Sequence, residues 1–224
     1  MTINFLHAEH HESECGVVAG IRMCRFLMIT LSLLLLLAPM GAAGLAETTP
    51  TSSVKATIDE VLAVLSDPAM KVPEKQAERR AKLEEIIGGR FDYEEMAKRT
   101  LPTQWKSLKT EQQKEFVTLF QQFLANSYVG NVDGYSGEQI EYGKERQKGD
   151  FAEVQTKVVS PKVQIPLDYR LLKKNGEWRV YDVVIDGVSL MKNYRGQFAR
   201  IIDSDSFDTL LEKLRTKTDL GASS

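Results

Sequence analysis

The stretch Glu177-Trp-Arg-Val-Tyr-Asp-Val-Val-Ile185 decides the fold, because it is rich in β-branched and aromatic residues. Asn175-Gly176 stands directly before it, and this pair is the strongest hairpin signal in the chain. Apolar residues occupy both registers of the strand, with Trp178, Val180 and Val184 predicted on one face and Tyr181, Val183 and Ile185 on the other. A strand that is apolar on both sides has to be covered on both sides.

Three more strands are predicted upstream, because apolar residues there recur with a period of two. They cover residues 139–144, 151–159 and 163–172. A Lys148-Gly149-Asp150 turn separates the first two. Together with 177–185 they predict an antiparallel meander of about four strands.

Before residue 130 the apolar period is that of a helix. It predicts helices over 54–65, 73–87, 92–101 and 110–129. Gly88-Gly89 is expected to end the second helix, and capping boxes at Asp92–Glu95 and Thr110–Gln113 open the next two. After Asp186-Gly187, helices are predicted over 190–202 and 206–217.

Helices, then a meander, then helices indicate the α+β class. A strongly twisted sheet with helices folded over its concave face tends to form a cone with an apolar interior. Such a cone suits a small ligand, provided that its own side chains do not fill it. Sequence alone does not separate the two cases, because a packed core and a lined pocket show the same periodicity.

The first 46 residues have the order of a secretory signal peptide. Arg22 and Arg25 precede the apolar run 26–37, Pro39 follows, and Gly44-Leu45-Ala46 fits the small-x-small cleavage rule. We expect cleavage before residue 47, which leaves 47–224 as a single domain. We also hypothesise that translation begins at Met23, since residues 1–21 are acidic. The alternative is an uncleaved anchor, because 26–46 is uncharged over 21 residues.

Composition limits the chemistry. Of 224 residues 42% are hydrophobic and 27% charged, as in ordinary globular proteins. Both cysteines and all three histidines lie in residues 1–46, so the expected mature chain contains no Ser–His relay, thiolate nucleophile or Cys/His zinc site. Its 27 basic and 28 acidic residues argue against a nucleic-acid binder, which usually carries a basic face.

Acid–base catalysis would then need Asp, Glu, Lys or Tyr, and Asp182 is the candidate. It shares its predicted register with Trp178 and Val180, so it is a polar member of an apolar face. One interpretation is a desolvated general base inside a cone. The other is a structural carboxylate that accepts backbone or arginine hydrogen bonds.

Several motifs resemble the MlaC (toluene-tolerance auxiliary) family. The most specific is Trp178-Arg-Val-Tyr-Asp-Val-Val-Ile-Asp-Gly-Val-Ser-Leu190, followed by Asn193-Tyr-Arg-Gly-Gln-Phe198. Upstream, Phe91-Asp-Tyr-Glu-Glu-Met96 and the series Trp105, Thr110, Gln113, Phe116 and Phe120 are similar to the helical half of that family. The resemblance spans about residues 54–214.

This resemblance implies a non-enzymatic periplasmic carrier that moves phospholipid between the two envelope membranes, with a cone-shaped fold related to nuclear-transport-factor-like domains. It implies an inner-membrane ABC transporter complex with a lipid-binding ring subunit, and an outer-membrane lipoprotein complex, as partners. No cofactor is implied apart from the bound phospholipid, which is cargo. Hopanoid or another lipid is an alternative cargo.

We therefore expect acyl chains to lie between the long helix and the sheet. The residues predicted to bind them are Met96, Trp105, Phe120, Leu124, Tyr128, Val158, Leu167, Tyr169, Tyr181, Val183 and Ile185. Two other hypotheses remain open. One is a cone-fold enzyme with Asp182 as general base, and the other is an envelope adaptor with a filled core and no ligand.

Overall fold

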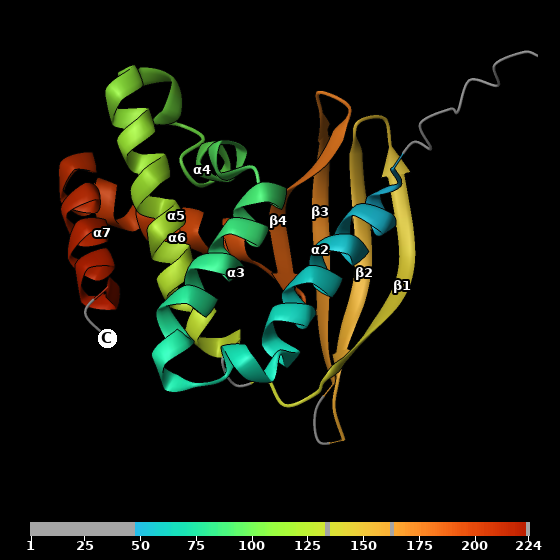
Figure 1. Cartoon of the computed structure of the whole chain (residues 1–224). Coiled ribbons are helices and arrows are strands. Elements are labelled where there is room, and N and C mark those ends of the chain that lie inside the picture. The colour runs from blue at the N-terminus through green and yellow to red at the C-terminus, as the bar shows by residue number, and fades with distance from the viewer. Residues whose placement is uncertain (1–47, 133–134, 162–163, 223–224) are drawn as a thin grey trace, which may run out of the picture. The chain divides into compact units, whose positions relative to one another are not determined.

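A computed structural model describes residues 48–132, 135–161 and 164–222. The predicted signal peptide, residues 1–46, lies outside the described residues. Within them, helices precede and follow a twisted antiparallel sheet (Figure 1), so the α+β prediction is confirmed.

The sheet is a simple meander in which each strand pairs with the next. The strands are β1 Gln139–Lys148, β2 Phe151–Val159, β3 Gln164–Lys174, β4 Glu177–Ile185 and β5 Val188–Ser189. The hairpin before β4 has positive φ at Asn175 (54°) and Gly176 (84°), which is the turn that Asn-Gly predicts. The two-residue β5 was not predicted, because no periodic pattern fits into two residues.

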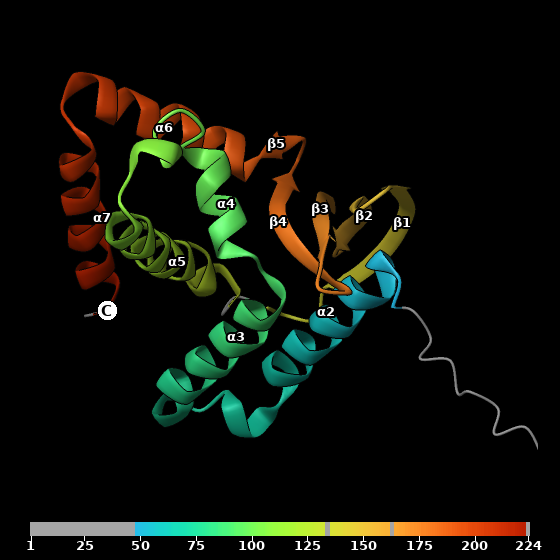
Figure 2. The same ribbon diagram turned by 90° about the horizontal axis from the view of Figure 1, so that it is seen from above.

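The helices form two groups. The first consists of α2 Pro50–Ser66 and α3 Gln76–Arg90, which pack on each other, while α2 also contacts β1 and β2. The second consists of α4 Tyr93–Thr100, α5 Thr110–Val132, α6 Leu190–Ser204 and α7 Phe207–Ala222. In Figure 2, α5 and α7 lie side by side, and α6 joins this group to β4. Short 3-10 helices occupy Pro68–Met70, Pro73–Lys75 and Trp105–Ser107.

Several predicted helix boundaries are wrong: α2 begins at Pro50 and not at 54, α3 begins at Gln76 and not at 73, and α7 ends at Ala222 and not at 217. Helix α3 continues through Gly88 and Gly89 to Arg90, whose Nη1 donates to the carbonyl of Trp178 at 3.0 Å and whose Nε donates to Thr57 Oγ1 at 3.0 Å. These tertiary bonds hold the last turn, and tertiary context commonly overrides the low helix propensity of glycine. Helix α5 likewise runs to Val132, beyond the predicted end at 129.

Neither predicted capping box forms as a reciprocal pair, and the first is confirmed only as an N-cap, because the Asp92 amide donates to the Val180 carbonyl and not to Glu95. Asp92 caps α4, because its Oδ1 accepts from the Glu95 amide at 3.0 Å. The other is displaced by one residue. The Lys109 amide donates to Gln112 Oε1 at 3.1 Å, whereas Gln113 Nε2 donates to the carbonyl of Trp105 at 2.8 Å.

A β-bulge corrects the predicted faces of β4. Leu171 pairs with Val180 and Arg170 pairs with Asp182, so Tyr181 is an extra residue on this strand. One extra residue reverses the side to which every later side chain points. Val183 therefore packs in the same cluster as Val180, and Asp182 lies on the other face of the sheet.

Two large hydrophobic clusters result, beside a small one of Val64, Leu65 and Leu83 between α2 and α3. The sheet cluster lies on the inner face of the sheet under α2, and its buried members are Val54, Ala152, Val154, Leu171, Trp178, Val180 and Val183. The helical cluster joins α4, α5, α6 and α7, and it includes Phe116, Phe120, Phe198, Leu210 and Leu214. Phe91 and Leu190 pack against both clusters, so they mark the boundary between them.

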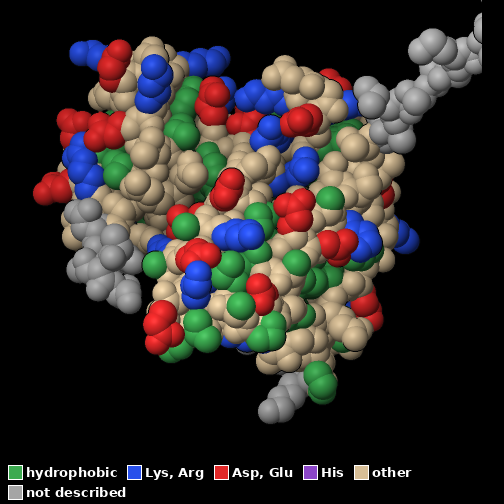
Figure 3. All heavy atoms as spheres, in the orientation of Figure 1, with side chains coloured by type: hydrophobic (Ala, Val, Ile, Leu, Met, Phe, Trp, Pro, Cys, Tyr) green, Lys and Arg blue, Asp and Glu red, His purple; other side chains and the backbone are tan. Residues whose placement is uncertain are grey.

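The surface is mixed in charge. Figure 3 shows acidic and basic side chains interspersed with hydrophobic ones on the face that carries α2 and α3, so this face has no field of a single sign. None of the described helices is long and apolar enough to cross a bilayer.

Candidate functional site

An apolar cavity of about 240 Å³ lies between α3, α4, α5 and the inner face of the sheet. Apolar side chains from four elements line the cavity. They are Ile87 of α3 and Phe91 at its C-cap, Met96 of α4, Leu124 of α5, and Val183 and Ile185 of β4. Exposed Gln121 and Gln122 border it from α5, whereas Met96 is fully buried. The mouth therefore opens at the seam between α3 and α5.

The structure brings six of the predicted lipid-binding residues together in this wall. They are Met96, Leu124, Tyr128, Tyr169, Val183 and Ile185. All six come from the long helix, α4 or the two central strands, which is where the prediction placed the acyl chains.

The other five predicted residues do not line the cavity. Phe120 is fully buried in the helical cluster, and Trp105 packs against that cluster from a 3-10 turn. Tyr181 lies at the bulge, where Phe151 contacts it edge-on and the Arg99 guanidinium lies 3.8 Å from its ring centroid. Leu167 packs on the sheet cluster, and Val158 pairs with Ile140 and Ile165 farther along the sheet.

Sequence reasoning missed several lining residues, among them Ile87, Phe91 and Ala125. A signal for some of them was present. Gln121, Leu124, Ala125 and Tyr128 lie three, four and seven positions apart, which is one face of a helix. The prediction that Leu124 and Tyr128 line the cavity therefore implies that Gln121 and Ala125, on the same face, line it too.

Burial holds the phenols of Tyr169 and Tyr93 in the neutral form. Burial raises the pKa of Tyr169, and burial together with nearby Glu84 raises the pKa of Tyr93 to about 12. Tyr128 shares a hydrogen bond of 3.0 Å with buried Tyr194, which ties α5 to α6. Among the described lining residues, Glu84 is then the one that carries a charge.

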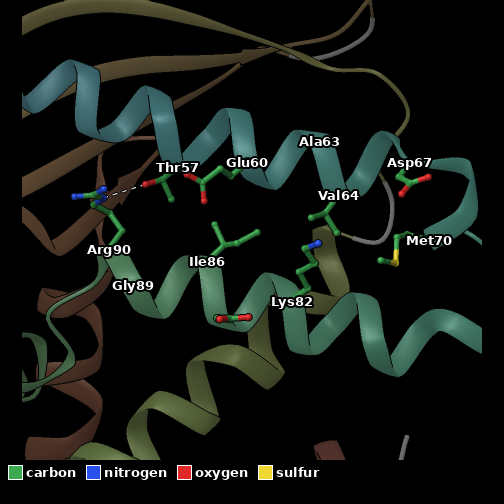
Figure 4. A pocket seen from close by; sticks show the side chains of 11 residues that line it. Thr57, Glu60, Ala63, Val64, Asp67, Met70, Lys82, Ile86, Gly89 and Arg90 are labelled. Atoms are coloured by element: carbon green, nitrogen blue, oxygen red, sulfur yellow. Dashed lines mark hydrogen bonds between the residues drawn. The ribbon is translucent and has the colours of Figure 1, made fainter.

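A larger hollow of about 720 Å³ lies on the other side of α3, between α3 and α2 (Figure 4). In Figure 4, Lys82 and Ile86 extend from α3 toward α2, and Arg90 bonds Thr57. Its lining includes the charged residues Glu60, Asp67, Lys82, Glu85 and Arg90. Because burying such charges against hydrocarbon is costly, the smaller cavity is the better site for an apolar ligand. Helix α3 forms the wall between the two hollows.

Asp182 is part of a structural network. Arg170 Nη1 lies 3.0 Å from its Oδ2, Ser189 Oγ donates to it at 2.7 Å, and the Met191 amide donates to Oδ1 at 3.1 Å. The carboxylate is buried on the outer face of the sheet and does not line the cavity. The bulge at Tyr181 is the reason, and the structural interpretation of Asp182 is the one that the geometry supports. Within the described residues, no group of three His, Cys, Asp or Glu side chains could hold a metal ion.

Similar proteins share this architecture. A solved structure of a phospholipid-binding protein from Ralstonia solanacearum in complex with a phospholipid has a TM-score of 0.67 and 25% sequence identity. The match covers 76% of this chain and 97% of that one.

Two curated relatives match over nearly the same length. The intermembrane phospholipid transport system binding protein MlaC of Haemophilus influenzae is 24% identical, and the match covers 77% of this chain and 83% of the relative. The toluene tolerance protein ttg2D of Pseudomonas putida is 26% identical, with 79% and 83% covered. The family model for the MlaC protein matches residues 55–216, which is most of the chain. The chain therefore belongs to the MlaC family.

Proposed function

We propose that this protein is a periplasmic lipid carrier that holds the acyl chains of a phospholipid in the cavity between α3, α5 and the sheet. The observation that carries the proposal is the apolar wall, to which Met96, Leu124, Val183 and Ile185 contribute. The relatives support the proposal, because they are described as phospholipid-transport and phospholipid-binding proteins and their chains match most of this one. The lipid is cargo in this proposal, not a cofactor, and no catalytic step is required.

The energetics of hydrocarbon set the mechanism. Two chains of about 15 methylenes each would cost about 24 kcal/mol to expose to water, at about 0.8 kcal/mol per methylene. Release into water is then negligible. A carrier has to offer a wall nearly as apolar as a bilayer and to exchange its cargo while docked on a partner that shields the chains.

The size of the cavity adds a condition. At about 240 Å³ it is smaller than typical ligand pockets, which measure about 300–1,000 Å³. We therefore propose that the walls move apart during loading. The natural place is the seam between α3 and α5, because the mouth lies there and the lining of the seam includes the exposed side chains Gln121 and Gln122.

The proposed partners follow from the need to exchange cargo at both membranes. They are an inner-membrane ABC transporter complex with a lipid-binding ring subunit and an outer-membrane lipoprotein complex. A phospholipid is the proposed cargo because of the phospholipid-binding relatives. A hopanoid would use the same apolar wall, and the identity of the extracted lipid distinguishes the two.

The test is to fill the cavity. Val183 is buried in the wall, so Val183→Trp should abolish lipid loading while the protein still folds. Val188, which is 57% exposed, provides the matched control Val188→Trp. Lipid extracted from each protein after incubation with phospholipid vesicles is quantified by mass spectrometry, and circular dichroism checks the fold.

We expect stoichiometric lipid in the wild type and in the control, and at least a tenfold loss in Val183→Trp. Equal lipid content in the two variants would show that the acyl chains lie elsewhere. A wild-type protein that gains no lipid from vesicles or from a partner would refute the carrier function.

A further inference from the structure

The one charged side chain among the described lining residues of the cavity lies at its mouth. Glu84 of α3 shares the rim with Gln121 and Gln122 of α5. Its side chain is 40% exposed, so it is accessible to a group that projects from the cavity into water. Burial and nearby Glu84 together raise the pKa of Tyr93 to about 12, which places a neutral phenol beside the same carboxylate.

A cation stands next to Glu84 and is held in place. Arg80, one helical turn earlier, donates from Nε to Glu84 Oε1 at 2.9 Å. Its Nη2 also donates to Oδ1 of Asn126 on α5, and the amide of Asn126 donates to the carbonyl of Thr218 at 3.0 Å. The carboxylate of Glu84 therefore has a guanidinium beside it, one helical turn from the lining of the cavity, and the bond to Asn126 of α5, which itself bonds to α7, fixes the position of that guanidinium.

We infer that this Arg80–Glu84 pair selects lipids whose headgroup carries both a phosphate and a cationic amine. The inference rests on the proposed function, because a headgroup reaches the mouth only if the acyl chains lie inside. The negatively charged phosphate then faces the Arg80 guanidinium, and the positively charged ammonium faces the Glu84 carboxylate. Each charged group of the lipid therefore lies opposite a side chain of the other sign. An anionic headgroup without an amine brings its phosphate to the same rim with no cation for the carboxylate.

The experiment is a competition between two phospholipids with identical acyl chains. Delipidated protein is incubated with vesicles of phosphatidylethanolamine and phosphatidylglycerol in equal amounts. It is then reisolated, and the bound lipids are quantified by mass spectrometry. We expect the wild type to enrich phosphatidylethanolamine about fivefold, which corresponds to about 1 kcal/mol for a partly exposed charge pair.

Two variants assign the selectivity to Glu84. Glu84→Gln removes the charge with little change in shape, so the bound ratio should return to that of the vesicles. Glu84→Lys should shift the bound ratio toward phosphatidylglycerol. The neighbouring Glu85 lines the α2–α3 hollow on the other side of the helix, so Glu85→Gln is the matched control and should keep the wild-type ratio.

The outcomes separate this inference from the carrier function. A wild type that binds lipid in the vesicle ratio, or a Glu84→Gln variant that keeps the wild-type enrichment, overturns the selectivity and leaves the carrier function intact. A wild type that takes up neither lipid, from the vesicles or from a partner, refutes the carrier function itself. If Glu84→Gln does not fold, Glu84→Lys and Glu84→Asp supply the same comparison, with the aspartate variant expected to retain the preference.

Discussion

Helix α5 meets two regions that use the same kinds of residue for opposite purposes. Phe116 and Phe120 are fully buried, and each contacts Phe198 edge-on, with ring centroids 5.8 and 5.6 Å apart. One and two turns later, Leu124 and Tyr128 border the cavity. The first region is filled because α6 and α7 supply aromatic and aliphatic partners. The second faces a cavity, whose opposite wall includes Val183 and Ile185 of β4. A packed core and a binding cavity therefore differ in what faces a residue, not in the residue itself.

The largest effect should come from matched leucine truncations in the two regions. Leu210 of α7 is fully buried in the helical cluster, so Leu210→Ala should lower the free energy of unfolding by about 3–5 kcal/mol. Leu124 already borders empty space, so Leu124→Ala should cost about 2 kcal/mol. Urea denaturation of lipid-free protein measures both values, and equal costs would mean that the cavity wall is packed like the core.

The second prediction concerns Asp92, which joins the two regions. Its backbone amide donates to Val180 of β4 at 2.8 Å, and its carboxylate caps α4 and lies 3.0 Å from Lys174 Nζ. Burial raises the pKa of Asp92, but the hydrogen bond from Glu95 and the charge of Lys174 outweigh it, and the net pKa is below its usual range. A lowered folded-state pKa stabilises the protein above the unfolded pKa of about 4, and this contribution is lost as the pH falls through the folded value.

Asp92→Asn should therefore lower the free energy of unfolding by about 1 kcal/mol at pH 7. The difference from wild type should shrink toward zero as the pH falls below about 4. Denaturation curves at pH 7, 5 and 3 provide the test. A difference that is independent of pH would assign the effect to the shape of the cap and not to its charge.

The smallest effect is expected at the mouth and has the opposite sign. A Cβ at Gly88 would have Gln121 Nε2 as its nearest neighbour, at 3.9 Å, which is ordinary van der Waals contact. Gly88→Ala should therefore stabilise the protein by about 0.5–1 kcal/mol, since alanine loses less backbone entropy in a helix. Thermal denaturation measures the change, and a loss of stability would show that the seam between α3 and α5 has no spare room.

Local sequence patterns predicted most of the fold. They failed where contacts with distant parts of the chain determine the end of an element. Both ends of β2 and β4 match the prediction, because alternation and Asn175-Gly176 are local signals. The end of α3 was missed, since the bonds of Arg90 to Thr57 and Trp178 come from distant parts of the chain.

The site was predicted only in part for a related reason. The structure places Met96, Leu124 and Val183 in the cavity wall, and each is apolar and belongs to an element expected around the cavity. Phe120 was misplaced because helical periodicity gives the buried side of α5 but not which partner covers each turn. Tyr181 was misplaced because strict alternation assumes a strand without a bulge.

The bulge in β4 also determines how the strand would respond to a change of chain length at one position. Loss of Tyr181 would place Asp182 directly after Val180, still opposite Arg170, so strict alternation would return and every later side chain would keep its side of the sheet. If the bulge flattened with Tyr181 retained, the carboxylate of Asp182 would project among hydrocarbon, away from Arg170 and Ser189, while Val183 would turn outward. A one-codon deletion at this position is therefore compatible with the register of the strand, whereas a flattened bulge is not.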